Sequence, residues 1–152
     1  MKRMPKVAGF RLVKESTETY NEKPPTRIRM PKDVFVLMEP FANRELAETF
    51  WVIPLNAQHD VIGGPIAVSR GILTEANVHA REIFRSLILL NACAVIFCHN
   101  HPGGDPTPSP NDRMVTDSLL AAGKILDIPV HDHIIIGNDT GRYVSFAESG
   151  LL

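Results

Sequence analysis

The sequence predicts a mixed α/β or α+β sandwich that forms one domain. At 152 residues the chain has the length of a single ordinary domain and is too short for an eight-stranded α/β barrel. Short apolar runs of strand composition alternate with longer segments in which apolar residues recur every three or four positions. The sequence shows no internal repeat. These features favour helices packed on a mixed sheet over a repeat architecture.

The first half of the chain is predicted to contain an arm, a short helix and two strands. Residues 1–30 are polar and aperiodic, so we expect an N-terminal arm or peripheral segment beside a domain over residues 31–152. Proline suits the first turn of a helix, so Pro31 is expected to open a helix over 32–38, which Pro40 then limits. The other elements expected here are a helical turn over 44–48, strands over 50–55 and 66–73, and a hairpin connection over 56–60.

The second half is predicted to alternate between helix and strand. Apolar spacings of three and four indicate a helix over 77–92, and the continuous apolar run 94–98 is typical of a central strand buried on both faces. A proline-rich loop leads to a helix that starts near Pro110 and ends between Gly123 and Leu126. The last strands are expected over 130–136 and 143–146, with a turn at 138–141.

Composition excludes several classes of protein. Apolar residues make up 44% and charged residues 22% of the chain, and the formal charge is −1. Such a chain lacks the basic footprint of a nucleic-acid or membrane-surface binder. The longest apolar stretch, 87–98, is too short to span a bilayer, and the first ten residues lack the apolar core of a secretory signal. We therefore expect a cytoplasmic protein in which Cys93 and Cys98 are buried reduced thiols.

The residues that carry chemistry lie between positions 99 and 112. Side chains alternate along a strand, so His99 and His101 can both reach one ion while Asn100 points to the opposite face. Asp112, at the start of the next helix, would be a third ligand, and a three-ligand site that leaves room for water is typical of catalytic zinc. The purely structural alternative is a pair of polar residues at a strand end, followed by a helix-capping box of Ser109 and Asp112.

The same segment does not fit three other metal-site classes. The contiguous letters H-N-H at 99–101 are not those of an HNH nuclease, whose three residues are dispersed. A metallo-β-lactamase needs Asp-His soon after the histidine pair, where this chain has Pro102 and Gly103. A zinc deaminase needs H-x-E and a later P-C-x-x-C, and the sequence contains neither.

This segment resembles the H-x-H-x10-D zinc motif of the JAMM (JAB/MPN) metalloproteases, and in particular the RadC branch of that family. The matching residues are His-Asn-His-Pro at 99–102, Pro-Ser at 108–109 and Asp at 112. Residues 78–84, 132–137 and 145–151 resemble three further patterns of that branch, although Ala80 replaces its usual proline and Gly103 its usual serine. The likeness covers roughly residues 31–152. It implies a short form without the N-terminal helix-hairpin-helix region that many relatives carry.

This resemblance implies an α/β/α sandwich with a mixed central sheet, similar to the cytidine deaminase fold. It also implies a Zn²⁺-dependent hydrolase of peptide or isopeptide bonds. His99, His101 and Asp112 would bind the Zn²⁺, and Ser109 would help to stabilise the oxyanion.

The family mechanism also needs an upstream glutamate that accepts the proton of the attacking water. Glu48, two residues ahead of Phe50, matches the branch best, and Glu45 is the competing candidate. The expected partner is a protein or peptide substrate.

The sequence is also compatible with other classes of function. One is a non-catalytic module of the same fold in a DNA-repair, DNA-maintenance or mobile-element assembly, and another is a zinc nuclease. The near-neutral charge makes direct DNA binding doubtful, and a homo-oligomer is left open. His131 and His133 repeat the same-face spacing without an acidic partner, so we expect a structural or substrate-contact role for them rather than a second metal site. Trp51 is expected in the core.

Overall fold

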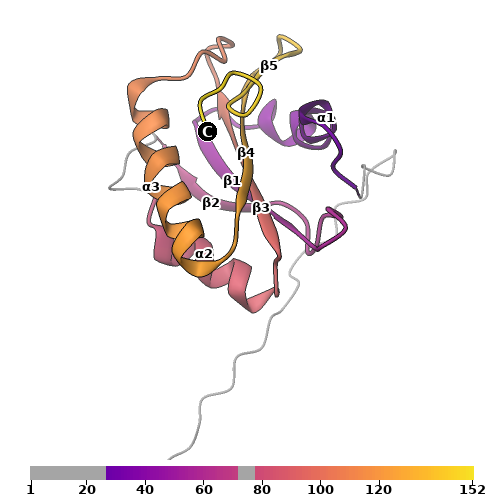
Figure 1. Cartoon of the computed structure of the whole chain (residues 1–152). Coiled ribbons are helices and arrows are strands. Elements are labelled where there is room, and N and C mark those ends of the chain that lie inside the picture. The colour runs from indigo at the N-terminus through magenta and orange to yellow at the C-terminus, as the bar shows by residue number, and fades with distance from the viewer. Residues whose placement is uncertain (1–26, 72–77) are drawn as a thin grey trace, which may run out of the picture.

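A five-stranded mixed sheet with helices on both faces forms the described part of the chain (Figure 1). The computed structural model describes residues 27–71 and 78–152. In chain order the elements are α1 (Pro31–Ala42), β1 (Thr49–Leu55), β2 (Ile66–Arg70), α2 (Ala80–Leu89), β3 (Ala94–His101), α3 (Pro110–Leu126), β4 (Val130–Gly137) and β5 (Arg142–Ser145). The strand order is β2-β1-β3-β4-β5. Only the β3–β4 pair of this sheet is parallel, and the predicted fold class is confirmed.

Two apolar cores lie on the two faces of the sheet. α1 packs against alternate residues of β1 and β3, including Trp51 and Ile96, so the prediction of a core Trp51 is confirmed. α2 and α3 pack against the intervening residues, including Val52 and Phe97. Because both faces are covered, every residue of β1 is buried, as is typical of a central strand.

β3 is the central strand, and it is longer than its apolar run. It pairs antiparallel with β1 and parallel with β4, and it extends through His101. The register of the parallel pair sets Phe97 opposite His133 and His99 opposite Ile135. The chain returns from the end of β3 to the start of β4 through α3, because parallel neighbours need a crossover connection.

α3 begins and ends where the sequence predicts. Ser109 is the N-cap residue and Pro110 the first helical residue, and Asp127 ends the helix in the left-handed conformation with φ 56°. Five residues at spacings of three and four form its buried stripe, namely Asp112, Val115, Thr116, Leu119 and Gly123. The stripe carries two polar side chains, and both belong to the site described below.

The prediction that Pro40 limits the first helix is wrong. Pro40 lies inside α1. A proline at this position removes the hydrogen bond to the carbonyl of Val36. Val36 is 50% exposed, so water can satisfy that carbonyl. The helix also continues because Phe41 and Ala42 pack on the apolar core.

Three other predicted boundaries differ from the structure. The helical turn predicted over 44–48 is wrong, because only a turn at 43–44 follows α1 and residues 45–48 are irregular. β2 ends at Arg70, and the rest of the strand predicted to 73 falls largely on residues 72–77, outside the described residues. α2 is shorter than the predicted 77–92; Leu90 is its C-cap, and Asn91 has a positive φ of 54°.

The predicted hairpin connection is present in the structure, which describes only the end of the predicted N-terminal arm. The hairpin connection at 56–60 is confirmed by a bridge between Leu55 and Val61. Most of the predicted arm, residues 1–26, lies outside the described residues. Ile28, near the end of the arm, is buried in the apolar core between α1 and the sheet. No helix within residues 27–71 and 78–152 has the length and apolar character needed to cross a bilayer.

The prediction of two buried thiols is half wrong. Cys98 is buried in β3, and burial raises the pKa of its thiol. Cys93 is exposed, because it precedes β3 and lies outside the layer between sheet and helices. Both cysteines are free.

Gly123→Ala tests the packing of α3 against the start of β4. A Cβ at Gly123 would stand 2.6 Å from the backbone oxygen of Ile128 and 3.3 Å from the ring of Phe84. We therefore expect the substitution to lower the free energy of unfolding by about 1–3 kcal/mol, although alanine in an open helix would raise it by about 1 kcal/mol.

Urea denaturation measures this change, and Gly103→Ala is the control. A Cβ at Gly103 meets no atom within 4 Å, so that variant should stay within about 0.5 kcal/mol of the parent. A Gly123→Ala variant as stable as the parent would contradict the described approach of Ile128.

Candidate metal centre

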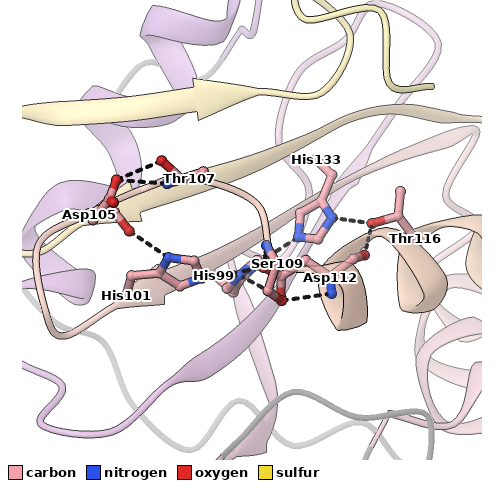
Figure 2. Close-up of polar contacts among 8 residues, drawn as sticks. All are labelled: His99, His101, Asp105, Thr107, Ser109, Asp112, Thr116 and His133. Carbon is pink, nitrogen blue, oxygen red and sulfur yellow. Dashed lines mark hydrogen bonds and ion pairs between the residues drawn. The ribbon is translucent and has the colours of Figure 1, made fainter.

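Three side chains from β3 and α3 converge at the carboxyl end of β3 (Figure 2). Nε2 of His99 lies 3.3 Å from Oδ1 of Asp112, and Nε2 of His101 lies 3.5 Å from Oδ2 of the same carboxylate. The two Nε2 atoms are 3.0 Å apart. The potential ligand atoms of all three residues lie within 4.8 Å of one another. The structure therefore brings together all three residues that the sequence predicts as metal ligands.

The alternation of β3 places the two histidines on one face. Val95 and Phe97 belong to the core beneath α2 and α3, and His99 and His101 continue that series past the apolar residues. Asn100 points to the other face, where its side chain forms hydrogen bonds with the backbone of Ala47, ahead of β1, and of Thr49, the first residue of β1. The predicted same-face arrangement is confirmed.

Asp112 is fixed by the helix cap. Its Oδ2 accepts a hydrogen bond from the amide of Ser109 at 2.7 Å, and its own amide donates to Oγ of Ser109 at 3.1 Å. The capping box and the metal-ligand role are thus compatible, because one carboxylate serves both. Burial alone would raise the pKa of Asp112, but its close contacts with His101 and His99 outweigh burial and hold that pKa well below its usual range.

His101 is oriented by the loop that follows β3. Its Nδ1 lies 2.7 Å from the backbone oxygen of Asp105, and a carbonyl can only accept, so Nδ1 carries the hydrogen. Asp105 is itself fixed, because its carboxylate accepts hydrogen bonds from the amide and the hydroxyl of Thr107. In the neutral ring the lone pair of His101 Nε2 therefore faces Asp112.

The charges of the three converging side chains suit a cation. Burial lowers the pKa of His99, and Asp112 only partly opposes that effect. Burial also acts to lower the pKa of His101, but its contacts with Asp112 and Asp105 outweigh burial and raise it. An ionised carboxylate and two imidazoles whose Nε2 atoms lie beside it are a donor set that divalent transition metals bind. The residues present therefore fit a metal ion.

The two candidate glutamates lie in different surroundings. Asn100 accepts a hydrogen bond from the amide of Thr49 at 2.8 Å and donates one to the carbonyl of Ala47 at 3.3 Å, so it fastens the backbone on both sides of Glu48. Burial dominates the pKa of His99, and the charge of Glu48 acts in the opposite direction, which places that carboxylate within electrostatic range. Glu45 instead forms an ion pair with Arg70 at 2.8 Å.

The sequence did not connect two residues, His133 and Thr116, with the ligands. His133 on β4 contacts His99, and Thr116 on α3 contacts His133. The spacing of four between positions 112 and 116 is the only sequence signal for Thr116. The pairing with His133 depends on the strand register, which no local pattern gives. Its neighbour His131 is exposed and faces His59 instead.

The fold and the site together define a class. A three-layer α/β/α sandwich with a His-His-Asp group that could bind a metal ion is the arrangement of JAMM domains. This chain belongs to the RadC-like JAB domain family, whose sequence model matches residues 28–151.

Curated relatives agree with this assignment. A UPF0758 protein of Methanosarcina mazei is 42% identical over 135 residues, which cover 89% of this chain and 58% of that protein. Another UPF0758 protein, of Symbiobacterium thermophilum, is 47% identical over 122 residues, which cover 80% of this chain and 51% of that protein. The chain thus spans little more than half the length of these relatives.

Metal content tests the site directly. Protein purified without chelators should carry about one divalent metal ion per chain, because three acceptors from fixed elements face one point. Elemental analysis across the first-row metals measures this content. The double variant His99→Ala/His101→Ala should lose the metal, whereas His131→Ala, which alters an exposed histidine, should keep it. A stoichiometric metal in the double variant would show that the ligands lie elsewhere.

Proposed function

We propose that this chain is a zinc-dependent metallohydrolase that cleaves peptide or isopeptide bonds. The observation that carries the proposal is the group formed by His99, His101 and Asp112, with the carboxylate of Glu48 in electrostatic range. Two imidazoles and one carboxylate suit Zn²⁺, and three protein ligands leave one position for water. Membership of the RadC-like JAB domain family supports the same chemistry.

Glu48 is the proposed general base. Zn²⁺ held by the three ligands would polarise the scissile carbonyl and lower the pKa of a water molecule toward about 7. The carboxylate of Glu48 accepts a proton from the attacking water and passes it to the leaving amine. Asn100 restricts the backbone on both sides of Glu48, and this keeps the carboxylate close to its working position.

Ser109 is the proposed oxyanion donor. Its Oγ accepts the amide hydrogen of Asp112 in the capping box, and a hydroxyl that accepts a hydrogen bond still has its own hydrogen to donate. Ser109 is half-buried beside the ligand Asp112. A donor fixed at that position can stabilise the negative charge that develops on a carbonyl oxygen.

The exposure of the ligands favours a macromolecular substrate. The side chains of His99 and Asp112 are almost completely buried, whereas that of His101 is 15% exposed. The site therefore opens to the surface on the side of His101. A peptide segment of a larger protein can approach a site that lies so close to the surface.

A proteomic search for cleaved peptides tests the proposed activity. Zinc-loaded protein is incubated with a native protein extract, and new peptide termini are identified by mass spectrometry. We expect termini that the parent produces and that the variant His101→Ala does not. Identical termini from both proteins, or none from either, would contradict the hydrolase and favour the non-catalytic module.

Glu48→Gln separates catalysis from metal binding. The amide keeps the size and polarity of the side chain but cannot accept a proton. We expect unchanged zinc content and circular dichroism, with turnover of an identified substrate reduced by about 10²–10⁴-fold. Ser109→Ala should reduce turnover less and should also cost about 1 kcal/mol of stability as a lost helix cap.

Glu45→Gln is the matched control for this experiment. It removes an exposed ion pair with Arg70, which is worth little, so turnover should hardly change. Full activity in Glu48→Gln with loss in Glu45→Gln would move the base to Glu45. Full activity in both variants would contradict the proposed mechanism.

A further inference from the structure

His133 is a fully buried histidine with a polar partner at each ring nitrogen (Figure 2). Its Nε2 lies 2.8 Å from Nδ1 of His99, and its Nδ1 lies 2.6 Å from the hydroxyl oxygen of Thr116. Three aromatic rings surround it at centroid distances of 5.4, 6.2 and 4.8 Å, those of Phe50, Phe97 and Phe146. In such apolar surroundings a polar group is costly unless its contacts are hydrogen bonds.

The direction of these hydrogen bonds follows from Thr116. Its hydroxyl oxygen lies 2.6 Å from the backbone oxygen of Asp112, one helical turn earlier, and 2.6 Å from Nδ1 of His133. A carbonyl only accepts, so the single hydroxyl hydrogen goes to Asp112, and Nδ1 of His133 must carry a hydrogen that it donates to Thr116. A neutral imidazole has one N–H, so Nε2 of His133 accepts the hydrogen of His99 Nδ1. Nε2 of His99 then accepts in its 3.0 Å contact with Nε2 of His101, which therefore carries a hydrogen in the metal-free protein, as Nδ1 of His101 also does.

The opposite direction of the hydrogen bonds between Thr116, His133 and His99 is less favourable. Thr116 would then donate to His133, His133 to Nδ1 of His99, and the hydrogen of His99 would sit on Nε2, 3.3 Å from Asp112. The 2.6 Å contact between the Thr116 hydroxyl and the Asp112 carbonyl would hold no hydrogen and would be repulsive. A doubly protonated His133 is also disfavoured, because burial lowers its pKa well below the usual value.

We propose that His133, oriented by Thr116, is a positioning residue that keeps the hydrogen of His99 on Nδ1 and the lone pair of its Nε2 toward the metal position. The same chain of bonds ends on the carbonyl of Asp112, so it links two of the three ligands. His101 reaches the equivalent state by a separate route, through the backbone oxygen of Asp105. The role builds on the metal site of the proposed function but requires no hydrolytic activity.

Nitrogen NMR of the metal-free protein tests the tautomer directly. Long-range ¹H–¹⁵N spectra of uniformly labelled protein report which ring nitrogen carries the hydrogen, and at about pH 8 histidines of ordinary pKa are neutral. We expect the hydrogen of His99 on Nδ1 and that of His133 on Nδ1. A His99 ring with its hydrogen on Nε2 would overturn the proposal.

Two variants test the consequence for metal binding. His133→Phe keeps an aromatic ring in the apolar surroundings but removes both nitrogens, so zinc affinity, measured by competition with a chelating indicator, should fall about 10–100-fold. Thr116→Val has nearly the same shape and removes only the hydroxyl that orients His133. We expect a smaller loss of affinity for this variant, and a detectable fraction of His99 with its hydrogen on Nε2.

His131→Phe is the matched control, because His131 lies on the same strand but is exposed and faces His59. Its zinc affinity should equal that of the parent. Urea denaturation of the metal-free variants shows whether each one folds; if His133→Phe does not, the spectra of the parent and of Thr116→Val decide. Unchanged zinc affinity in both His133→Phe and Thr116→Val would overturn the positioning role, whereas absence of zinc binding by the parent would overturn the metal site itself.

Discussion

The parallel pairing of β3 with β4 is the constraint on which the site depends. A parallel pair needs a crossover connection, so the chain leaves the end of β3, turns through a proline-rich loop and returns along α3. The first turn of α3 therefore lies beside the end of β3, where Asp112 meets His99 and His101. The same pairing places β4 next to β3 in a register that brings His133 against His99. One topological feature thus assembles residues that lie up to 34 positions apart.

The site is held by bonds that serve local structure as well. Asp112 completes a capping box at the start of α3, and His101 bonds to the backbone of its own loop. Each side chain loses its freedom through contacts within the protein before any metal binds, which is the preorganisation that a precise metal site requires. A buried polar cluster of this kind is favourable only when its bonds are satisfied, and the contacts of Thr116 and His133 contribute to this.

Local patterns predicted what depends on local physics. The capping residues and apolar spacing of α3 fixed its start, and the apolar run of β3 identified the central strand with both histidines on one face. The sequence alone does not show that α1 continues past Pro40, because the effect of a helical proline depends on whether the carbonyl that loses its hydrogen bond reaches water, which is a tertiary property. The proposal of Glu48 over Glu45 also draws on the fold, since the contacts of Asn100 and Arg70 that distinguish the two glutamates cross the structure. The contact between His133 and His99 depends on the register of β3 and β4, and no local sequence pattern predicts it.

X-ray absorption at the zinc edge tests the central claim most directly, namely that two histidines and one aspartate form an open metal site. Zinc-loaded protein should show four nitrogen or oxygen neighbours at about 2.0–2.2 Å, with the multiple scattering of two imidazoles and no sulfur. A sulfur neighbour at about 2.3 Å would contradict the account by placing the metal at a cysteine. A third imidazole would contradict it as well, because His133 would then be a ligand and not the residue that orients one.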